Sequence, residues 1–166
     1  MDLPVFDLHC DLLSYLGDLP EAHPSNTEEI GCAFPRHAEG NVKLQVLAIF
    51  ASTGGGSTRS ARRQVELFPR LLTDERDRLY AVSDADRIDT AGESDRTGVL
   101  LALENASCFC EEDEPLDRGL DRLEWILDEA GPVLYVSPTH LGPNRFGGGA
   151  PDTAGLSDDG RVLLDF

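Results

Sequence analysis

Several short segments of the chain are apolar at consecutive positions, and this pattern restricts the fold more than any other feature. A strand with one face in water alternates apolar and polar residues, whereas a parallel strand buried on both faces does not. We therefore expect about five parallel strands. They are Val5–Leu8, Asn41–Ala51 (NVKLQVLAIFA), Leu79–Val82, Gly98–Leu103 (GVLLAL) and Pro132–Val136 (PVLYV).

The segments between these strands have helical spacing. The spacing of four and three predicts a helix over Pro115–Ala130, with one apolar face at Leu116, Leu120, Leu123, Leu127 and Ala130. A second helix is expected over Ser57–Leu72, where Pro69 should kink or shorten it. Its apolar side is formed by Ala61, Val65, Phe68 and Leu72.

Two further segments are less regular. A short helical turn is expected from Ser83 or Asp84, and the polar stretch from Asp18 to Glu39 is interpreted as a long excursion after the first strand. Strands that alternate with helices indicate an α/β chain with a parallel sheet. A (β/α)₈ barrel needs eight strands and typically about 250 residues. The 166 residues therefore predict one domain, 1–166, that is a partial TIM-like barrel.

Charge and hydropathy exclude several kinds of partner. The net charge is −17, from 31 acidic and 14 basic residues, so nucleic-acid phosphates and anionic lipids are repelled. The acidic surplus also fits a high-salt environment, where salt screens self-repulsion. There is no apolar run of membrane-spanning length, and Asp2 and Asp7 stand where a secretory signal would be basic. We expect a cytoplasmic protein without a membrane span.

His9 and Asp11 lie where the first predicted strand ends, in the segment DLHCDLL. Residues two apart on a strand point to the same side, so an imidazole and a carboxylate are expected to converge there. Zinc accepts both kinds of ligand. The alternative is structural: His9 is a hydrogen-bonded histidine, and Asp11 caps the helix that follows.

Two other predicted strands also end in polar side chains. Glu104 follows the run Gly98–Leu103, and His140 follows the strand that ends at Val136, with Asn144 four residues later. A carboxylate after four apolar residues is costly to bury unless it meets water, a cation or a hydrogen-bond donor. Glu104 alone could simply face solvent, but three strand ends with such groups are better explained by a single site.

The cysteines do not indicate a metal site of their own. Cys10, Cys32, Cys108 and Cys110 form no CxxC pair, and a reducing cytoplasm keeps thiols reduced. The pair Cys108 and Cys110 could suggest a soft-metal site, but free thiols are the simpler interpretation.

Taken in order along the chain, these segments resemble the membrane (renal-type) dipeptidases, peptidase family M19. The matching segments span nearly the whole chain: DLHCDL at 7–12, GNVKLQ at 40–45, LENA at 103–106, THLGPNRFGGG at 139–149 and GLSDDGRVLL at 155–164. Related metal barrels such as the TatD-like nucleases carry HxH at the first strand, whereas Asp11 stands at the third position here.

The resemblance implies a (β/α)₈ metallopeptidase with a binuclear zinc site that hydrolyses dipeptides. By this resemblance His9 and Asp11 bind one zinc ion, Glu104 bridges both, and His140 contacts the scissile carbonyl or its oxyanion. A hydroxide held between the metals attacks the peptide bond, because zinc lowers the pKa of bound water.

The chain departs from this family in one large respect. The family's second-zinc histidines lie on strands after the Gly-Leu-Ser/Thr helix, and the chain reaches Phe166 inside the helix expected from near residue 155. His23 and His37 lie outside any family motif. We therefore expect a truncated dipeptidase with an incomplete second metal site and little activity alone.

Two alternatives remain open from the sequence. One is a non-catalytic metal-binding or assembly fragment, which forms a homo-oligomer or pairs with a complementary C-terminal fragment through unpaired strand edges. The other is a different amidohydrolase-type metal hydrolase with another small-molecule substrate.

Overall fold

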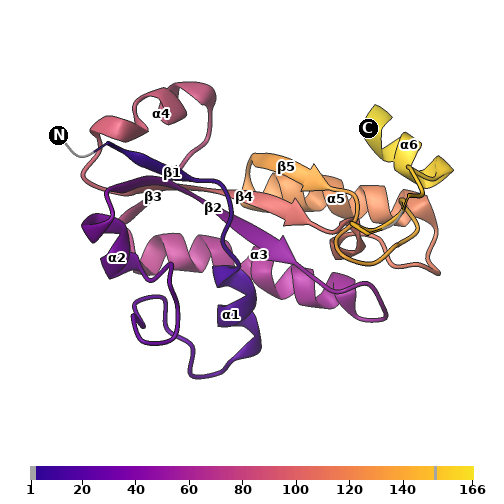
Figure 1. The fold of residues 1–166 in the computed structure, drawn as a ribbon, viewed down its shortest axis with the longest axis horizontal. Helices are drawn as coiled ribbons and strands as arrows, with labels where there is room; N and C mark the ends of the chain where they lie inside the picture. Colours follow the sequence, from indigo (N-terminus) through magenta and orange to yellow (C-terminus); the bar gives the residue numbers. More distant parts are fainter. Residues whose placement is uncertain (1–2, 152) are drawn as a thin grey trace.

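Five parallel strands form one sheet in the computed structural model, which describes residues 3–151 and 153–166 (Figure 1). The strands are β1 (Val5–Asp7), β2 (Val42–Phe50), β3 (Leu79–Ala81), β4 (Thr97–Glu104) and β5 (Val133–Ser137). β1 pairs with β2, and β2 pairs with β4. The first half of β4 pairs with β3 and its second half with β5. The prediction of an α/β fold with about five parallel strands is confirmed.

β2 and β4 are the centre of the sheet. They pair at consecutive positions from Leu44 with Gly98 to Phe50 with Glu104, so both strands end at the same edge. Six of the nine residues of β2 and seven of the eight residues of β4 are buried, as their consecutive apolar positions predict.

The helices lie on both sides of this sheet and beyond its carboxyl edge (Figure 1). The α-helices are α1 (Leu12–Asp18), α2 (Phe34–Glu39), α3 (Ser57–Asp74), α4 (Ala85–Asp89), α5 (Leu116–Ala130) and α6 (Asp158–Asp165). Two short 3₁₀ turns are η1 (Ala91–Glu93) and η2 (Ala106–Cys108). In the described part of the chain, no helix combines the length and apolar character needed to cross a bilayer.

The two faces of the sheet have separate cores. The larger core lies between the sheet and α1, α3 and α5, and it includes Leu47, Leu101, Val65 and Leu123. The smaller one contains five buried side chains, from Leu44, Val46, Val82, Leu100 and Ala102. Tyr80, Ile88 and Tyr135 partly cover this smaller core.

The predicted helices need three corrections. α3 continues five residues beyond Pro69, so the expectation that Pro69 shortens the helix is wrong. Val65, Phe68 and Leu71 are buried around Pro69, and this packing outweighs the lost amide hydrogen bond. On α5 the buried positions are Gly119, Leu123 and Ile126, whereas Leu127 is 38% exposed.

The apolar face of α5 is thus rotated from the predicted one, because Gly119 packs directly against Cys110. The third correction concerns α6, which begins at Asp158 rather than near residue 155. There Ser157 is the N-cap, and its hydroxyl accepts a hydrogen bond from the Gly160 amide.

The first strand and the segment after it also differ from expectation. β1 was expected to be a buried strand, but Val5 and Phe6 are each 42% exposed. In the described structure β1 pairs only with β2, so it is an edge strand with one open side. The segment expected to be a polar excursion contains α2 and follows α1, which buries Leu12 and Leu13.

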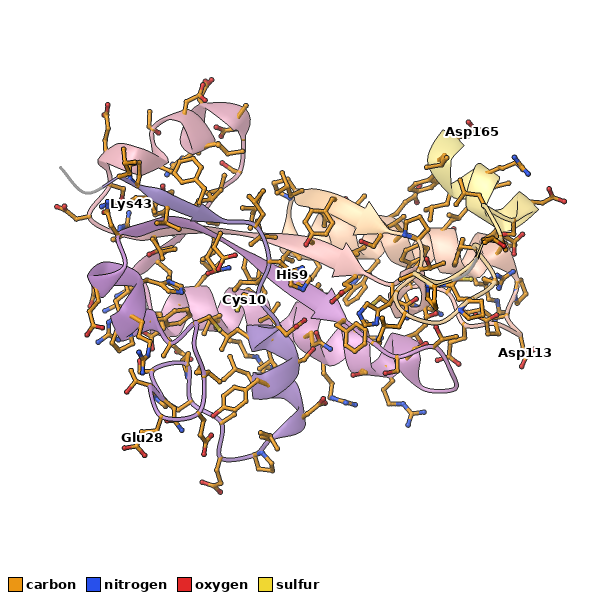
Figure 2. All side chains as sticks on the ribbon, viewed as in Figure 1. His9, Cys10, Glu28, Lys43, Asp113 and Asp165 are labelled. Atoms are coloured by element: carbon orange, nitrogen blue, oxygen red, sulfur yellow. The ribbon has the colours of Figure 1, made fainter. Side chains whose placement is uncertain are left out.

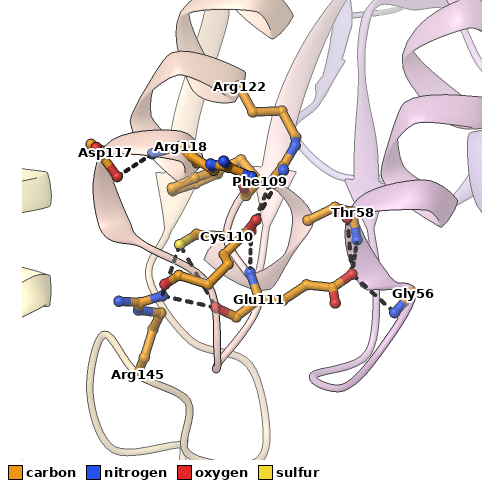
Figure 3. A network of polar contacts seen from close by, with 10 residues as sticks. Gly56, Thr58, Phe109, Cys110, Glu111, Asp117, Arg118, Arg122 and Arg145 are labelled. Carbon is orange, nitrogen blue, oxygen red and sulfur yellow. Dashed lines mark hydrogen bonds and ion pairs between the residues drawn. The ribbon is translucent and has the colours of Figure 1, made fainter.

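A network of hydrogen bonds fastens the last segment to the loop between β4 and α5 (Figure 3). Arg145 Nη1 donates to the carbonyl oxygens of Glu111 and Glu114 at 2.8 and 2.5 Å, and its Nε donates to Asp159 Oδ2 at 2.8 Å. Arg122 forms a two-pronged pair with Glu114, at 2.7 and 3.0 Å. α6 is therefore held by charge-assisted bonds as well as by apolar packing.

Candidate metal centre

The carboxyl edge of the sheet brings four predicted site residues together. His9 and Asp11 follow β1, Glu104 is the last residue of β4, and His140 follows β5. His9 lies near the middle of the molecule, where the strands end (Figure 2). Since the strands are parallel and neighbouring, their carboxyl ends place these side chains at one location.

Three of these residues form a compact cluster. One ligand atom from each of His9, Asp11 and Glu104 lies within 4.8 Å of the others. His9 Nε2 is 3.4 Å from Glu104 Oε2 and 3.7 Å from Asp11 Oδ1. An imidazole nitrogen and two carboxylates at this spacing match the ligand types of zinc and other divalent cations.

His140 lies on the other side of the Glu104 carboxylate. Its Nε2 is 3.3 Å from Glu104 Oε1, so each oxygen of Glu104 faces a different imidazole. The Phe50 ring packs edge-on against the His140 ring, with the ring centroids 5.0 Å apart. His140 is 38% exposed, and it can therefore reach a small molecule that enters from solvent.

The structure argues against the interpretation of Asp11 as a helix cap. Asp11 occupies the N-cap position of α1, yet its side chain makes no capping hydrogen bond. An aspartate at an N-cap ordinarily accepts a hydrogen bond from an amide in the first turn. Here the carboxylate is turned towards His9 instead, although neither residue lies within β1 itself.

Glu104 is not a solvent-facing strand end. Its side chain is only 18% exposed, and its neighbours in the sheet are Phe50 and Ser137. The residue after it, Asn105, has a φ of 75°, in the left-handed region that L-residues seldom adopt. This backbone conformation turns the chain sharply away from the sheet directly after Glu104.

Asn105 is held by four hydrogen bonds of its buried side chain. Its Nδ2 donates to the Ala51 carbonyl at 2.9 Å and to Thr53 Oγ1 at 3.1 Å. Its Oδ1 accepts from the Ser107 amide at 3.2 Å and from Asn144 Nδ2 at 2.8 Å. The loops that follow β2, β4 and β5 are therefore connected to one another immediately behind the cluster.

The loop that carries His140 is fixed by the same kind of contacts. Asn144 Nδ2 donates to the Pro138 carbonyl at 2.7 Å, and Thr139 Oγ1 donates to the Gly148 carbonyl at 2.8 Å. The Ala150 amide donates to the His140 carbonyl at 3.0 Å. His140 therefore stands on an internally bonded loop, which the sequence indicated only through Asn144.

Tyr135 is a contact residue that the sequence analysis did not single out. Its hydroxyl lies 2.7 Å from His9 Nδ1 and donates to the Leu8 carbonyl at 3.2 Å. Burial, followed by the charges of Glu104, Asp11 and Asp7, raises the pKa of Tyr135 above its ordinary value, so the phenol keeps its proton. The feature of the sequence that could have indicated Tyr135 is its position on the strand that precedes His140.

The charged groups around the His9–Asp11–Glu104 cluster are compatible with a bound cation. In residues 3–151 and 153–166, the ion pairs of Asp11 and Glu104 are with imidazoles, and none is with lysine or arginine. Asp7 adds a third carboxylate nearby, and its Oδ1 accepts a hydrogen bond from the His9 amide at 3.1 Å. Grouped carboxylates without a fixed cation repel one another, and a divalent cation would relieve that repulsion.

The remaining histidines lie away from this cluster. His37 is buried in α2, beside a cavity of about 160 Å³ that reaches the amino-terminal ends of β2 and β4. Burial lowers the pKa of His37, which favours its neutral form. His23 is in the loop before α2, where its Nδ1 accepts a hydrogen bond from the Ser25 amide.

All four cysteines are free thiols. Burial raises the pKa of Cys108 to about 12 and that of Cys110 to about 11, which keeps both protonated and poor metal ligands. A hydrogen bond with Cys32, followed by burial, raises the pKa of Cys10. Cys10 lies between His9 and Asp11 in the sequence, but its side chain packs into the larger core.

Solved structures share this fold. A metallopeptidase of family M19, the dipeptidase AC, is 22% identical with a TM-score of 0.77, over 99% of this chain and 53% of its own. A metallopeptidase from Rhodobacter sphaeroides, solved with a phosphinate mimic of L-Ala-D-Ala, is 19% identical with a TM-score of 0.78, over 99% and 56%. An amidohydrolase from Pseudomonas aeruginosa is 20% identical with a TM-score of 0.63, over 80% and 37%.

The prediction of a partial barrel is confirmed by this likeness, since the chain spans about half the length of the first of these structures. No curated protein matches the sequence. The family described as membrane dipeptidase, peptidase family M19, matches residues 1–159. With that match over nearly its whole length, the chain belongs to the M19 family of metal-dependent dipeptidases.

Proposed function

We propose that this chain provides the His9–Asp11–Glu104 part of a zinc centre that hydrolyses dipeptides. The observation that carries the proposal is the cluster itself, with three ligand atoms within 4.8 Å at the carboxyl edge of the sheet. Active sites of (β/α)₈ enzymes are built at this edge. The assignment of zinc rests on the mixed nitrogen and oxygen donors and on the family.

When bound, a zinc ion supplies a Lewis acid that polarises a carbonyl group and lowers the pKa of a bound water. The residues of this chain bind the ion and orient the substrate. His9, Asp11 and Glu104 would hold the ion, and Glu104 directs one oxygen towards each of the two imidazoles.

His140 is assigned to the substrate in this proposal. Its Nε2 lies at the edge of the cluster, where an N–H group can donate to a carbonyl oxygen as negative charge develops on it. The ring packing with Phe50 and the bonded loop keep this donor in place before the substrate arrives, so little reorganisation is needed.

A hydrolysis assay tests the proposal. Purified protein is assayed with added zinc against a panel of dipeptides, N-acyl amino acids and lactones. We expect weak cleavage of dipeptides, loss of that cleavage in His9→Ala and His140→Ala, and no loss in His23→Ala, because His23 lies outside the site. Cleavage of N-acyl amino acids in place of dipeptides would assign the chain to another amidohydrolase-type reaction.

Titration with zinc measures how many metal ions the chain binds. The described residues contain one cluster of ligand side chains, so we expect one zinc ion per chain and weak dipeptide turnover by the 166-residue chain alone. Robust turnover by this chain would contradict the proposal that further ligands are needed.

The open edge of β1 favours a second candidate function, assembly with another chain. Val5 and Phe6 are each 42% exposed, and Leu8 is 54% exposed beside them. An apolar strand with unpaired backbone groups is a template for strand addition. Size-exclusion chromatography with light scattering tests this candidate: a stable monodisperse monomer would argue against it, and a dimer that Phe6→Lys abolishes would support it.

A further inference from the structure

The hydroxyl of Tyr135 connects two strand ends that do not pair with each other. Tyr135 lies in β5, which pairs with β4, whereas Leu8 and His9 follow β1, which pairs with β2. The phenol oxygen is 2.7 Å from His9 Nδ1 and 3.2 Å from the Leu8 carbonyl oxygen. One hydroxyl group thus contacts both the imidazole and the backbone of the segment that carries His9.

The donors and acceptors around the Tyr135 hydroxyl determine which atom carries each hydrogen-bonding proton. A carbonyl oxygen only accepts hydrogen bonds, and a phenol has a single proton to donate. Both contacts of Tyr135 are satisfied only if its proton goes to Leu8 and its oxygen accepts from His9 Nδ1. Nδ1 then carries a hydrogen, and whenever the ring has a single hydrogen Nε2 presents a lone pair.

That lone pair faces the carboxylates. His9 Nε2 lies 3.4 Å from Glu104 Oε2 and 3.7 Å from Asp11 Oδ1. A lone pair and two carboxylate oxygens repel one another unless a cation lies between them, and all three groups are then its ligands. The Tyr135 contact therefore selects the form of His9 that can bind a metal.

We propose that Tyr135 is a positioning residue of the metal centre, which holds His9 in the Nδ1–H tautomer with Nε2 directed at Asp11 and Glu104. The inference rests on the proposed function and adds Tyr135 to the residues of that site. Tyr135 is suited to this role because its ring packs against the smaller core, which fixes the hydroxyl. Histidine ligands of metals generally donate their second N–H to an oxygen acceptor in this way.

Nitrogen NMR of the zinc-free protein tests the tautomer directly. The nitrogen signals of each ring show directly which of its two nitrogens carries a proton. The chain has four histidines, and the His9 signals are those that a His9→Gln variant lacks. We expect a protonated Nδ1 in the wild type, because that is the nitrogen beside the Tyr135 hydroxyl. A wild-type His9 without a proton on Nδ1 overturns the inference.

Zinc affinity, measured in competition with a chelator, tests whether the Tyr135 contact strengthens metal binding. Tyr135→Phe removes only the hydroxyl, and we expect affinity to fall about 10–100-fold, the usual effect of losing such a partner. Tyr80→Phe is the matched control: Tyr80 packs against the same core from β3, but it pairs with Gly98 at the other end of β4. Its zinc affinity should remain that of the wild type.

The His9 signals of the variants distinguish a positioning role of Tyr135 from a general contribution of Tyr135 to stability. In Tyr135→Phe we expect the tautomer to shift towards Nε2–H, which a loss of stability alone does not produce. Unchanged affinity together with an unchanged tautomer in Tyr135→Phe overturns the inference. If this variant does not fold, the wild-type tautomer still decides the question.

Failure of the proposed function has a different signature. In that case the wild type binds no zinc, or binds it equally well after His9→Ala. The tautomer of His9 in the zinc-free wild type and in Tyr135→Phe then judges the role of Tyr135 independently.

Discussion

Glu104 Oε2 lies 3.4 Å from His9 Nε2, although the two residues are far apart in the chain. Glu104 ends β4, and His9 follows β1, which does not pair with β4. β2 separates β1 from β4 in the sheet, so this approach depends on the curvature of the sheet and on the loop after β1. The contact places a carboxylate and an imidazole where a cation can bind both.

Replacement of Glu104 by glutamine should weaken zinc binding by more than about 100-fold, since it changes a charged ligand into a neutral amide, whereas the loss of a ligand's supporting partner costs less. The variant keeps the size of the side chain. Chelator competition measures the change, and Glu66→Gln, at an exposed position on α3, is the control. Equal affinities of the two variants would remove Glu104 from the site.

Asp11→Ala should separate the metal role from a capping role. Loss of an N-cap hydrogen bond typically costs about 1 kcal/mol, but Asp11 makes no such bond. We expect the free energy of unfolding to change by less than about 0.5 kcal/mol, while zinc affinity falls.

Asp84→Ala provides the contrast, because Asp84 Oδ1 accepts a hydrogen bond from the Arg87 amide at 3.0 Å as the N-cap of α4. It should lose about 1 kcal/mol of stability with unchanged zinc affinity. Urea unfolding measures both variants, and a larger stability loss in Asp11→Ala than in Asp84→Ala would restore the capping interpretation.

Two substitutions of Asn105 should have different costs. Both Asn105→Gly and Asn105→Ala remove its four side-chain hydrogen bonds, but only alanine is strained at a φ of 75°. We expect the alanine variant to be about 1–2 kcal/mol less stable than the glycine variant. Equal free energies of unfolding in urea would contradict the left-handed conformation after Glu104.

Arg145→Ala should release α6 from the rest of the fold. Arg145 is the donor to Asp159 and to the carbonyls of Glu111 and Glu114. Its contact with Glu111 is drawn in Figure 3. We expect the amides of α6 to exchange at least about 10-fold faster in deuterium exchange, as local opening becomes easier.

Arg161→Ala is the matched control on α6 itself. The Arg161 side chain is 70% exposed, and its contact with Asp158 is 3.7 Å long, so its removal should change little. Equal exchange rates for α6 in the two variants would show that the Arg145 network does not hold this helix.

The pair of Glu114 and Arg122 should make stability depend on pH. The hydrogen bonds from Arg122 hold the pKa of Glu114 below its ordinary value in the folded protein. A lowered folded-state pKa stabilises the fold above the unfolded pKa of about 4.3, and this contribution disappears as the pH falls through the folded value.

The stability advantage of the wild type over Glu114→Gln should therefore be largest near neutral pH and narrow as the pH falls from about 5 to 3. Urea unfolding across this range measures the difference, with Glu124→Gln, at an exposed position of α5, as the control. A constant difference between the wild type and Glu114→Gln would contradict the assignment.

Much of the sheet and of the site was predictable because the rules that govern them are local. Consecutive apolar positions in β2 and β4 identify buried parallel strands, and the carboxyl ends of parallel strands share an edge. The polar residues at or shortly after the ends of β4 and β5, Glu104 and His140, were therefore expected beside His9. A short helical turn was likewise expected from Ser83 or Asp84, and α4 has Asp84 as its N-cap.

Other features were predicted incorrectly because the sequence does not show which strands and helices pack against one another. The apolar run of β1 resembles a buried strand, but the order of strands makes it an edge. Pro69 ends a helix in isolation, whereas the core around Val65 and Phe68 maintains α3 through it. The buried face of α5 also differs from the predicted one, because Gly119 allows close contact with Cys110.

The sequence by itself determined the strand and helix types, the parallel sheet, and which ligand-type side chains stand at the strand ends, since periodicity and residue chemistry act over a few neighbouring residues. Only the tertiary structure decided that Glu104 lies between His9 and His140 and that Tyr135 contacts His9. These distances depend on strand order, sheet curvature and packing between distant segments. A contact of 2.7 Å across the sheet is set by the whole fold and by no local pattern.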